Sequence, residues 1–210
     1  YVLMKNPLFT GVCTALVTPF LDDRVNYPML EQLLRRQIDA GVKTIVICGT
    51  TGESPTLSDN EKLELFRRAK SYVGSSCQII AGTGSNSTDH TLELSKAAEE
   101  LGVDGLLLVS PYFNKAAPEG LWAHYMSVAH AVNLPIILYN VPSRTGVNIE
   151  PATYARLAEH PQICAIKEAG GNISKIVETA ALVGDKLDIY SGNDDQIVPI
   201  MACGGVGVIS

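Results

Sequence analysis

Short apolar segments alternate with helix-like segments along the whole chain, and this alternation limits the possible folds more than any other feature. The apolar segments are rich in Val, Ile and Leu, and eight of them occur, beginning at Val12, Thr44, Gln78, Gly105, Pro135, Ile163, Leu187 and Gly205. Each is too short for a typical helix. Their apolar residues are continuous rather than alternating, which is typical of strands covered on both faces.

Helix patterns fill most of the intervals between these strands. The pattern predicts helices over residues 27–40, 58–73, 87–101, 119–131, 150–159 and 173–182. Ser58 followed by Glu61 predicts a capping box, and Pro151 suits the first turn of a helix. Stop signals follow four of the predicted helices, at Gly41, Gly74, Gly102 and Gly184.

Strand–helix alternation of this kind implies parallel strands joined by right-handed crossovers. Eight such strands favour an α/β fold of the (β/α)8 TIM-barrel type, formed as one domain by residues 1–210, with an open doubly wound sheet as the alternative. Because the sequence stops at Ser210 with the eighth strand, we expect the barrel to lack its last helix and any C-terminal helical domain. An apolar flank should then be bare, either because the chain is a fragment or because a partner covers it.

Composition narrows the class of protein. The 210 residues are 46% hydrophobic and 18% charged with a net charge of -6, which indicates a globular chain with one substantial core. The acidic balance gives no reason to expect nucleic acid or an anionic membrane as a partner. No apolar run approaches the ~20 residues that span a bilayer, and the N-terminus lacks a signal-peptide pattern. We therefore expect a cytoplasmic location.

Cysteine and histidine usage predicts neither disulfides nor a metal site. The five cysteines are odd in number, scattered and mostly set in apolar runs, so we interpret them as small buried hydrophobes. They form no CxxC motif and no Cys/His cluster with metal-ligand spacing. The four histidines stand in helix-like stretches, where surface or packing roles are the simplest interpretation.

Polar and glycine-rich segments follow the strands at their carboxyl ends, where both candidate folds collect their chemistry. Their sequences are GTTGES from Gly49, GTGSNS from Gly82, SPYFNK from Ser110, YNVPSRTG from Tyr139, KEAGGN from Lys167 and SGNDDQ from Ser191. The glycine-rich segments suit phosphate binding through backbone N–H groups, yet neither matches a P-loop or a dinucleotide fingerprint.

Lys167 and Tyr139 are the candidate reactive pair. Alternation places Ala165 with Lys167 on one face of their strand, and Ile137 with Tyr139 on one face of the neighbouring strand. If both faces point into the barrel, burial lowers the lysine pKa, and the free amine can form a Schiff base with a ketone. A phenol that is hydrogen-bonded to a threonine could shuttle protons in that reaction. The simpler alternatives are an exposed strand-end lysine and an aromatic that only fills the barrel.

The motifs GTTGES, YNVPSRTG and IKEAGGN occur in this order on strands two, five and six, and the chain thereby resembles the dihydrodipicolinate synthase family, also called 4-hydroxy-tetrahydrodipicolinate synthase. The likeness extends from Gly11 to Ser210. It implies a (β/α)8 barrel, usually in a homotetramer or another homo-oligomer such as a dimer. The activity implied is a lyase-type condensation of pyruvate with L-aspartate 4-semialdehyde in diaminopimelate and lysine biosynthesis, with no metal or organic cofactor.

The resemblance also assigns roles to individual residues. Lys167 is similar to the family's Schiff-base lysine for pyruvate, Tyr139 to its general acid/base and Thr50 to the hydroxyl partner of that phenol. Thr51 would hold the pyruvate carboxylate through its backbone amide. Arg144 resembles the clamp on the carboxylate of the aldehyde, a bidentate task that suits arginine. Positions that line the pyruvate pocket in the family are occupied here by Gly192 and Ile209.

Three positions depart from the family pattern. Phe113 stands where the family usually has a second tyrosine that reaches across from a neighbouring subunit, so we expect a slower proton relay. His90 and Lys62 stand where lysine-inhibited members carry a glutamate and a histidine, although Ser54, Asn86 and Tyr112 match. The loss of a carboxylate at one position and the gain of a cation at the other, in a site for a cationic amino acid, predict weak inhibition by lysine.

Two alternative functions stay open at this point. Another pyruvate-dependent aldolase, such as an N-acetylneuraminate or keto-deoxy-sugar-acid lyase, would share the lysine and the tyrosine but not usually the PSRTG segment, so Arg144 favours the synthase. A catalytically impaired homologue is the other alternative, suggested by Phe113 and by the point at which the sequence stops.

Overall fold

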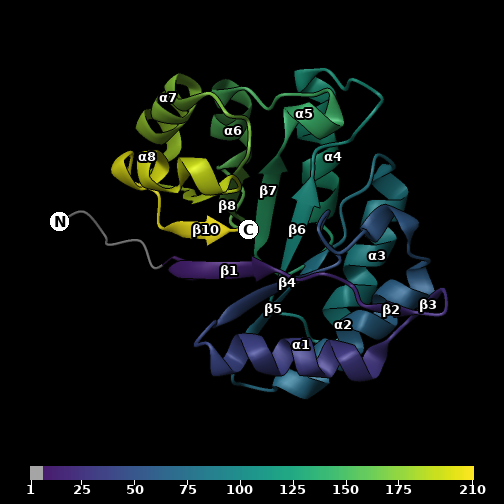
Figure 1. Ribbon diagram of the computed structural model, residues 1–210. Coiled ribbons are helices and arrows are strands. Elements are labelled where there is room, and N and C mark those ends of the chain that lie inside the picture. The colour runs from purple at the N-terminus through teal and green to yellow at the C-terminus, as the bar shows by residue number, and fades with distance from the viewer. Residues whose placement is uncertain (1–6) are drawn as a thin grey trace.

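The computed structural model describes residues 7–210 and shows a closed barrel, as the strand–helix alternation predicts (Figure 1). Within these residues, all strand pairs around the barrel are parallel, in the order β1-β10-β9-β8-β7-β6-β5-β4 with β4 returning to β1. The open doubly wound sheet is thereby excluded. The barrel strands are β1 (Gly11–Ala15), β4 (Thr44–Ile47), β5 (Gln78–Gly82), β6 (Gly105–Val109), β7 (Ile136–Asn140), β8 (Ile163–Glu168), β9 (Asp188–Ser191) and β10 (Gly207–Ile209).

The six helices predicted from the sequence are present, with slightly different ends. They are α1 (Tyr27–Asp39), α2 (Asp59–Val73), α3 (Thr88–Glu100), α4 (Pro118–Ala129), α6 (Pro151–Leu157) and α7 (Ile173–Val183). The capping box at Ser58 is formed in both directions with Glu61. Gly41 and Gly102 follow α1 and α3 with φ of +86° and +75°, a conformation that glycine adopts without strain.

Several short elements were not predicted. They are the hairpin β2 (Phe20–Leu21) and β3 (Arg24–Val25), the 3-10 turns η1 (Ser54–Thr56) and η2 (Asp194–Gln196), and the helices α5 (Pro142–Thr145) and α8 (Ile197–Ala202). The hairpin turns at Asp22 and Asp23, both with positive φ, and this acidic pair lacks the glycine that usually marks such a turn. The other elements are too short to show a helical period.

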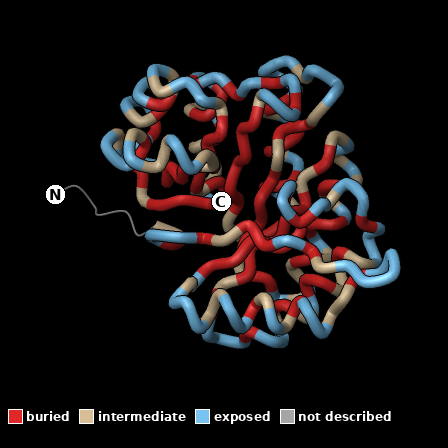
Figure 2. Tube along the Cα trace, viewed as in Figure 1, coloured by how far each residue is buried: buried red, intermediate tan, exposed pale blue. Residues whose placement is uncertain are grey.

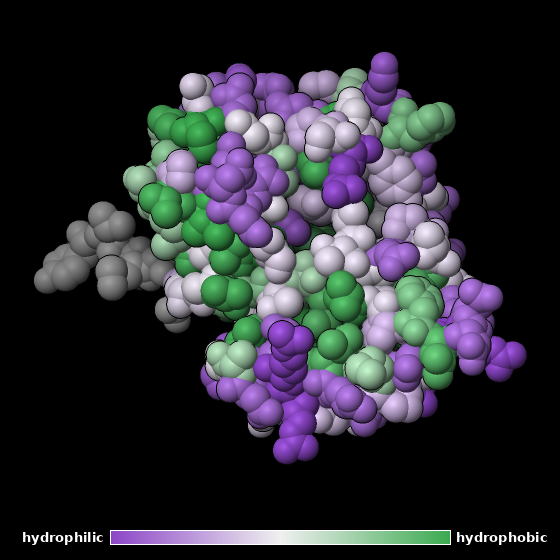
Figure 3. All heavy atoms as spheres, viewed as in Figure 1, coloured by the Kyte–Doolittle hydropathy of each residue, from purple (hydrophilic) through white to green (hydrophobic). Residues whose placement is uncertain are grey.

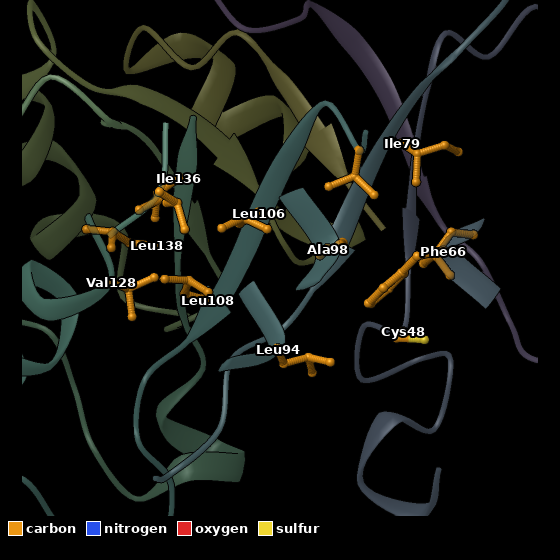
Figure 4. Close-up of a cluster of buried hydrophobic side chains, with 14 of the residues drawn as sticks. Cys48, Phe66, Ile79, Leu94, Ala98, Leu106, Leu108, Val128, Ile136 and Leu138 are labelled. Atoms are coloured by element: carbon orange, nitrogen blue, oxygen red, sulfur yellow. The ribbon is translucent and has the colours of Figure 1, made fainter. Parts of the chain in front are cut away.

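Apolar side chains form two concentric layers around the strands. Outward-facing side chains such as Leu106, Leu108 and Leu138 pack against Val128 of α4 and the other surrounding helices (Figure 4). Inward-facing side chains, among them Val46 and Ile137, fill the barrel itself. The strands are therefore buried along most of their length, while the helices keep an exposed outer side (Figure 2).

The N-terminal end of the barrel is closed by the segment before β1. The Phe9 ring stacks on Tyr190 with 4.2 Å between ring centroids, and the Tyr190 hydroxyl donates to the Phe9 carbonyl at 2.7 Å. The Leu8 amide donates to the Asp188 carboxylate at 3.0 Å. Because this end is closed, access to the barrel interior is left to the opposite end, where the strands terminate.

The side of the barrel around β1, β10 and α8 exposes apolar side chains. β1 and β10 lie side by side between α8 and α1 in Figure 1. Val12 of β1 is 57% exposed and Val198 of α8 is 78% exposed, and Figure 3 shows apolar surface on the α7–α8 side of the molecule. None of the helices in residues 7–210 has the length and hydropathy needed to cross a bilayer.

Candidate active site

Lys167 lies inside the barrel near the carboxyl end of β8. Its neighbours in the chain alternate as expected, because Ala165 and Ala169 belong to the barrel interior while Ile166 faces the helices. Only 6% of Lys167 is exposed. The side chain therefore does not reach bulk solvent at a strand end, which was the simpler alternative for this lysine.

Tyr139 of β7 is the direct neighbour of Lys167 across the sheet. The two residues are partners in the parallel register of β7 and β8. The Lys167 Nζ atom lies 4.4 Å from the centroid of the Tyr139 ring, so the amine packs on the ring face rather than on the hydroxyl. Both groups are thus at the mouth of the barrel, held there by strand pairing.

Burial gives Lys167 the character of a nucleophile. Loss of water lowers its pKa from 10.5 to about 8, the nearby Cys13 thiol opposes this, and the positive charge of Arg144 lowers the pKa further. With a pKa of about 8, about a tenth of the amine is neutral at pH 7. An exposed lysine would be neutral in a far smaller fraction of molecules.

Tyr139 is held in its protonated form. Burial raises the pKa of its phenol, and a polar contact with the Thr50 side chain and the charge of Arg144 reduce that rise. Thr50 stands in the turn after β4, where the Glu53 amide donates to its carbonyl at 3.0 Å. A protonated phenol beside a neutral amine can donate a proton to a leaving oxygen and later take one back.

A cavity of about 790 Å³ opens at this end of the barrel. Three of the predicted site residues line it: Thr50, Tyr139 and Arg144. Arg144 stands on α5, which begins with Pro142 and ends at Gly146, where φ is +72°. The cavity thus joins a phenol, a hydroxyl and a guanidinium, while Lys167 packs on the Tyr139 ring and is not among the described residues that line the cavity.

The other predicted residues lie outside this cavity. Gly192 packs against the lysine, since a Cβ placed there would be 3.1 Å from Lys167 Cε and 2.9 Å from Ala169 Cβ. Ile209 is fully buried inside the barrel, paired with Cys13 of β1. Thr51 is exposed in the turn beside Thr50 and is not among the described residues that line the cavity.

Comparison with known proteins decides the family. A model of the dihydrodipicolinate synthetase family matches residues 8–210. This chain belongs to that family. It is similar to the 4-hydroxy-tetrahydrodipicolinate synthase of Clostridium novyi, with 47% identity over 97% of this chain and 69% of that protein. It is also similar to 4-hydroxy-tetrahydrodipicolinate synthase 1 of Clostridium acetobutylicum, with 51% identity over 97% of this chain and 69% of that protein.

Solved structures of the family have the same barrel. The dihydrodipicolinate synthase of Thermotoga maritima matches with a TM-score of 0.94 and 42% identity, over 97% of this chain and 70% of that one. A structure described as a monomeric dihydrodipicolinate synthase variant matches with a TM-score of 0.94 and 42% identity, over 97% of this chain and 69% of that one. The chain therefore spans about 70% of the length of these relatives.

Phe113, one of the departures from the family pattern, is held in an unusual position. Its φ is +73° and 88% of the residue is exposed. Its amide donates to the Thr145 carbonyl of α5 at 3.1 Å, and its side chain borders the cavity. A bulky residue with positive φ is strained, and such strain persists only where surrounding contacts maintain it.

A second polar cluster borders the same cavity. The Lys62 Nζ atom is 3.5 Å from the Asp59 carboxylate, and His90 Nε2 is 2.9 Å from it. Ser54 and Tyr112 line the cavity on this side as well. The one carboxylate of the cluster is thus already engaged by two nitrogen groups.

One polar network beside the reactive lysine was not predicted from the sequence. Glu168 follows Lys167 in β8 but faces the opposite side, where Asn140 Nδ2 donates to its carboxylate at 3.0 Å. Both residues are polar and end strands that are otherwise apolar. That pattern of adjacent polar pairs, Tyr139–Asn140 and Lys167–Glu168, was the signal that could have revealed the network.

Proposed function

We propose that this chain is a 4-hydroxy-tetrahydrodipicolinate synthase, a lyase that joins pyruvate to L-aspartate 4-semialdehyde in the diaminopimelate route to lysine. The observation that carries the proposal is the buried Lys167 amine, with a pKa of about 8, packed 4.4 Å from the Tyr139 ring centroid at the mouth of the barrel. Membership of the family, in which curated relatives bear this name, supports the same activity.

The first stage of the reaction forms an imine. The neutral Lys167 amine attacks the keto carbon of pyruvate, and the keto oxygen takes a proton from Tyr139 to become a hydroxyl. The nitrogen loses a proton, and the hydroxyl leaves as water after a second protonation. Thr50, in polar contact with the phenol, connects Tyr139 to the protons released and consumed in these steps.

The second stage forms the carbon–carbon bond. The positively charged imine withdraws electrons, so the methyl carbon of pyruvate loses a proton and becomes a nucleophilic enamine. This carbon attacks the aldehyde carbon of the second substrate, whose oxygen takes up a proton. The amine of the product then displaces Lys167 from the imine carbon, which closes the ring and restores the free lysine.

Four further residues bind the substrates in this proposal. Arg144 holds the carboxylate of the aldehyde, supported by its place in the same cavity as Tyr139. Thr51 holds the pyruvate carboxylate through its backbone amide, in the turn that also carries Thr50. Gly192 and Ile209 form the wall of the pyruvate pocket, and the missing Cβ of Gly192 leaves room beside Lys167 Cε.

Borohydride trapping with pyruvate tests the proposal. We expect peptide mass analysis to find the reduced pyruvyl adduct on Lys167 and not on Lys62, a second buried lysine that borders the cavity. Lys167→Ala should abolish the adduct. An adduct elsewhere, or none, would contradict the mechanism. Trapping without turnover of aspartate semialdehyde but with turnover of a sugar-derived aldehyde would identify another aldolase, and trapping without turnover of any aldehyde would identify an impaired homologue.

We also propose that the chain forms a homo-oligomer, a tetramer or a dimer. An aromatic side chain that is 88% exposed, on a strained backbone beside the cavity, supports a contact with a second copy at Phe113. Light scattering after gel filtration should give a mass that is a multiple of one chain, and Phe113→Ser should lower it. A monomer at all concentrations would refute the proposal.

A further inference from the structure

Glu168 is a buried carboxylate that the proposed reaction does not use. It lies on the face of β8 opposite Lys167 and is 7% exposed. Its oxygens accept hydrogen bonds from the Gly170 amide at 2.7 Å, from Asn140 Nδ2 at 3.0 Å and from the Tyr154 hydroxyl at 3.3 Å. No salt bridge to Glu168 occurs within residues 7–210. The Glu168 carboxylate therefore acts as an acceptor for three hydrogen-bond donors.

The Asn140 side chain connects this carboxylate to a loop. Besides Glu168, its Nδ2 atom donates to Asn148 Oδ1 at 2.9 Å, and its Oδ1 atom accepts from the Ile149 amide at 3.1 Å. Asn140 ends β7, and the two contacted residues lie eight and nine positions further along the chain. One amide thus closes the base of the loop formed by residues 141–149, which we term the Arg144 loop.

Contacts within the Arg144 loop connect its base to Arg144. The Arg144 amide donates to the Val141 carbonyl at 2.9 Å. The Thr145 hydroxyl lies 3.2 Å from the Val141 carbonyl and 3.0 Å from the Val147 carbonyl. Because these bonds join both sides of the loop, the backbone that carries Arg144 moves with the base that Asn140 holds.

Glu168 also decides which way the Asn140 amide faces. If the amide turned over, its oxygen would face the Glu168 carboxylate and Asn148 Oδ1, and its NH2 group would face the Ile149 amide. All three contacts would then be lost, because acceptor would meet acceptor and donor would meet donor. A carboxylate accepts only, so it stabilises the one orientation that closes the loop.

We propose that Glu168 is a positioning residue, which acts through Asn140 to fix the Arg144 loop and thereby the place of the Arg144 guanidinium in the cavity. This inference rests on the proposed function in one respect, the assignment of the aldehyde carboxylate to Arg144. Glu168 itself touches no reacting atom. Its loss should therefore affect use of the aldehyde and leave formation of the pyruvate imine intact.

The main test is a double-mutant cycle between Glu168→Gln and Arg144→Ala. Glutamine has the size of glutamate, but it loses the negative charge and keeps only one acceptor oxygen, so its NH2 group takes the place of one of the two oxygens that accept from Asn140, Gly170 and Tyr154. We expect the KM for aspartate semialdehyde to rise about tenfold in Glu168→Gln, the scale of one lost charge-assisted contact. Trapping of pyruvate on Lys167 should proceed at the wild-type rate. In the Arg144→Ala background, Glu168→Gln should change the KM by less than about twofold.

Two further variants separate positioning from general stability. Tyr154→Phe removes one donor to the same carboxylate without touching the loop, so the KM for the aldehyde should stay near the wild-type value. Asn148→Ala removes an exposed loop contact of Asn140 and should raise that KM even if Glu168→Gln fails to fold. Thermal unfolding of each variant shows whether it is folded at the assay temperature.

Each outcome decides between the two proposals. The positioning role would be overturned if Glu168→Gln raised the KM for aspartate semialdehyde by the same factor in the wild-type and Arg144→Ala backgrounds. A parallel fall in the rate of pyruvate trapping would overturn it too. An unchanged aldehyde KM in both Glu168→Gln and Asn148→Ala would overturn it as well. Absence of a pyruvate adduct on the wild-type chain would instead refute the proposed function, and with it the substrate assigned to Arg144.

Discussion

At the scale of residues, the chemistry depends on removing one lysine from water while leaving a path to it. The Lys167 amine rests on the Tyr139 ring, and the absence of a side chain at Gly192 leaves space beside its Cε atom. Neither feature is unusual alone. Burial lowers the pKa of the amine, and the contacts with the Tyr139 ring and with Gly192 determine where the amine lies.

The reactivity of Lys167 should follow a pKa of about 8. The folded pKa is lower than 10.5, so the neutral amine increases as pH rises, about tenfold per pH unit below 8, and levels off above it. Competitive labelling with acetic anhydride, read peptide by peptide, measures this titration. Lys186, whose pKa is raised by Glu159, serves as the internal control. A midpoint for Lys167 at the ordinary lysine value would contradict the desolvated site.

Gly192→Ala should impair imine formation without unfolding the protein. The added methyl group would stand 2.9 Å from Ala169 Cβ and 3.1 Å from Lys167 Cε, so both the chain at Ala169 and the lysine side chain must move. We expect the rate of pyruvate trapping to fall at least about tenfold, because small displacements of a reacting group are costly. Gly120→Ala is the matched control, since its Cβ would meet only Ala116 Cβ at 3.8 Å. Equal trapping rates in both variants would refute the packing role.

Phe113→Tyr should raise turnover. The family usually has a tyrosine at this position, and phenylalanine keeps the ring while removing the hydroxyl that would extend the proton relay. The gain should approach about 10²-fold in kcat, the scale of acid–base assistance. Because the side chain is 88% exposed, the change should leave the free energy of unfolding nearly unchanged. Steady-state kinetics of the two proteins provides the comparison, and equal kcat values would show that the hydroxyl has no role here.

At the scale of elements, helix ends place side chains at the cavity. Ser58 caps α2, its hydroxyl accepting from the Glu61 amide at 3.3 Å while the Glu61 carboxylate accepts from the Ser58 amide at 2.8 Å. The same first turn carries Asp59 and Lys62, which belong to the polar cluster beside the cavity. The cap therefore fixes the start of the helix from which these two side chains extend.

Ser58→Ala should destabilise the protein by about 1 kcal/mol, because an amide in the first turn of α2 loses its partner. Urea unfolding followed by circular dichroism measures the change. Glu61→Gln keeps an acceptor for the Ser58 amide and should therefore lower the free energy of unfolding by less than Ser58→Ala does. If Glu61→Gln lowered the free energy of unfolding by more than Ser58→Ala, the negative charge at the start of the helix, rather than the cap, would provide the stability.

At the scale of the whole molecule, charge around the cavity should decide its response to lysine. Asp59 is the carboxylate of the polar cluster, and both Lys62 and His90 already contact it. We expect little inhibition by L-lysine, because another ammonium group would meet the charge of Lys62 at close range. Activity measured against lysine concentration tests this. A variant that combines His90→Glu with Lys62→His should gain inhibition, whereas saturable inhibition of the wild-type protein at low lysine concentration would contradict the prediction.

The sequence by itself determined the elements and their order. Continuous apolar runs such as Ile45–Ile47, which are too short for a typical helix, indicate strands covered on both faces, and cap residues such as Ser58 and Pro151 mark where helices begin. These signals are local, so they can be read without the fold. The short hairpin around Asp22 and the helix α5 escaped because neither has a period long enough to recognise.

Tertiary structure decided how the candidate site is assembled. Strand register sets Lys167 opposite Tyr139, and the parallel order of β7 and β8 brings Glu168 to Asn140, 28 residues away in the chain. Thr51 was predicted together with Thr50, yet of these two threonines only Thr50 lines the cavity. The fold also desolvates Lys167 and strains Phe113. Such properties depend on residues distant in the sequence, because burial and hydrogen bonding arise only when those residues come together.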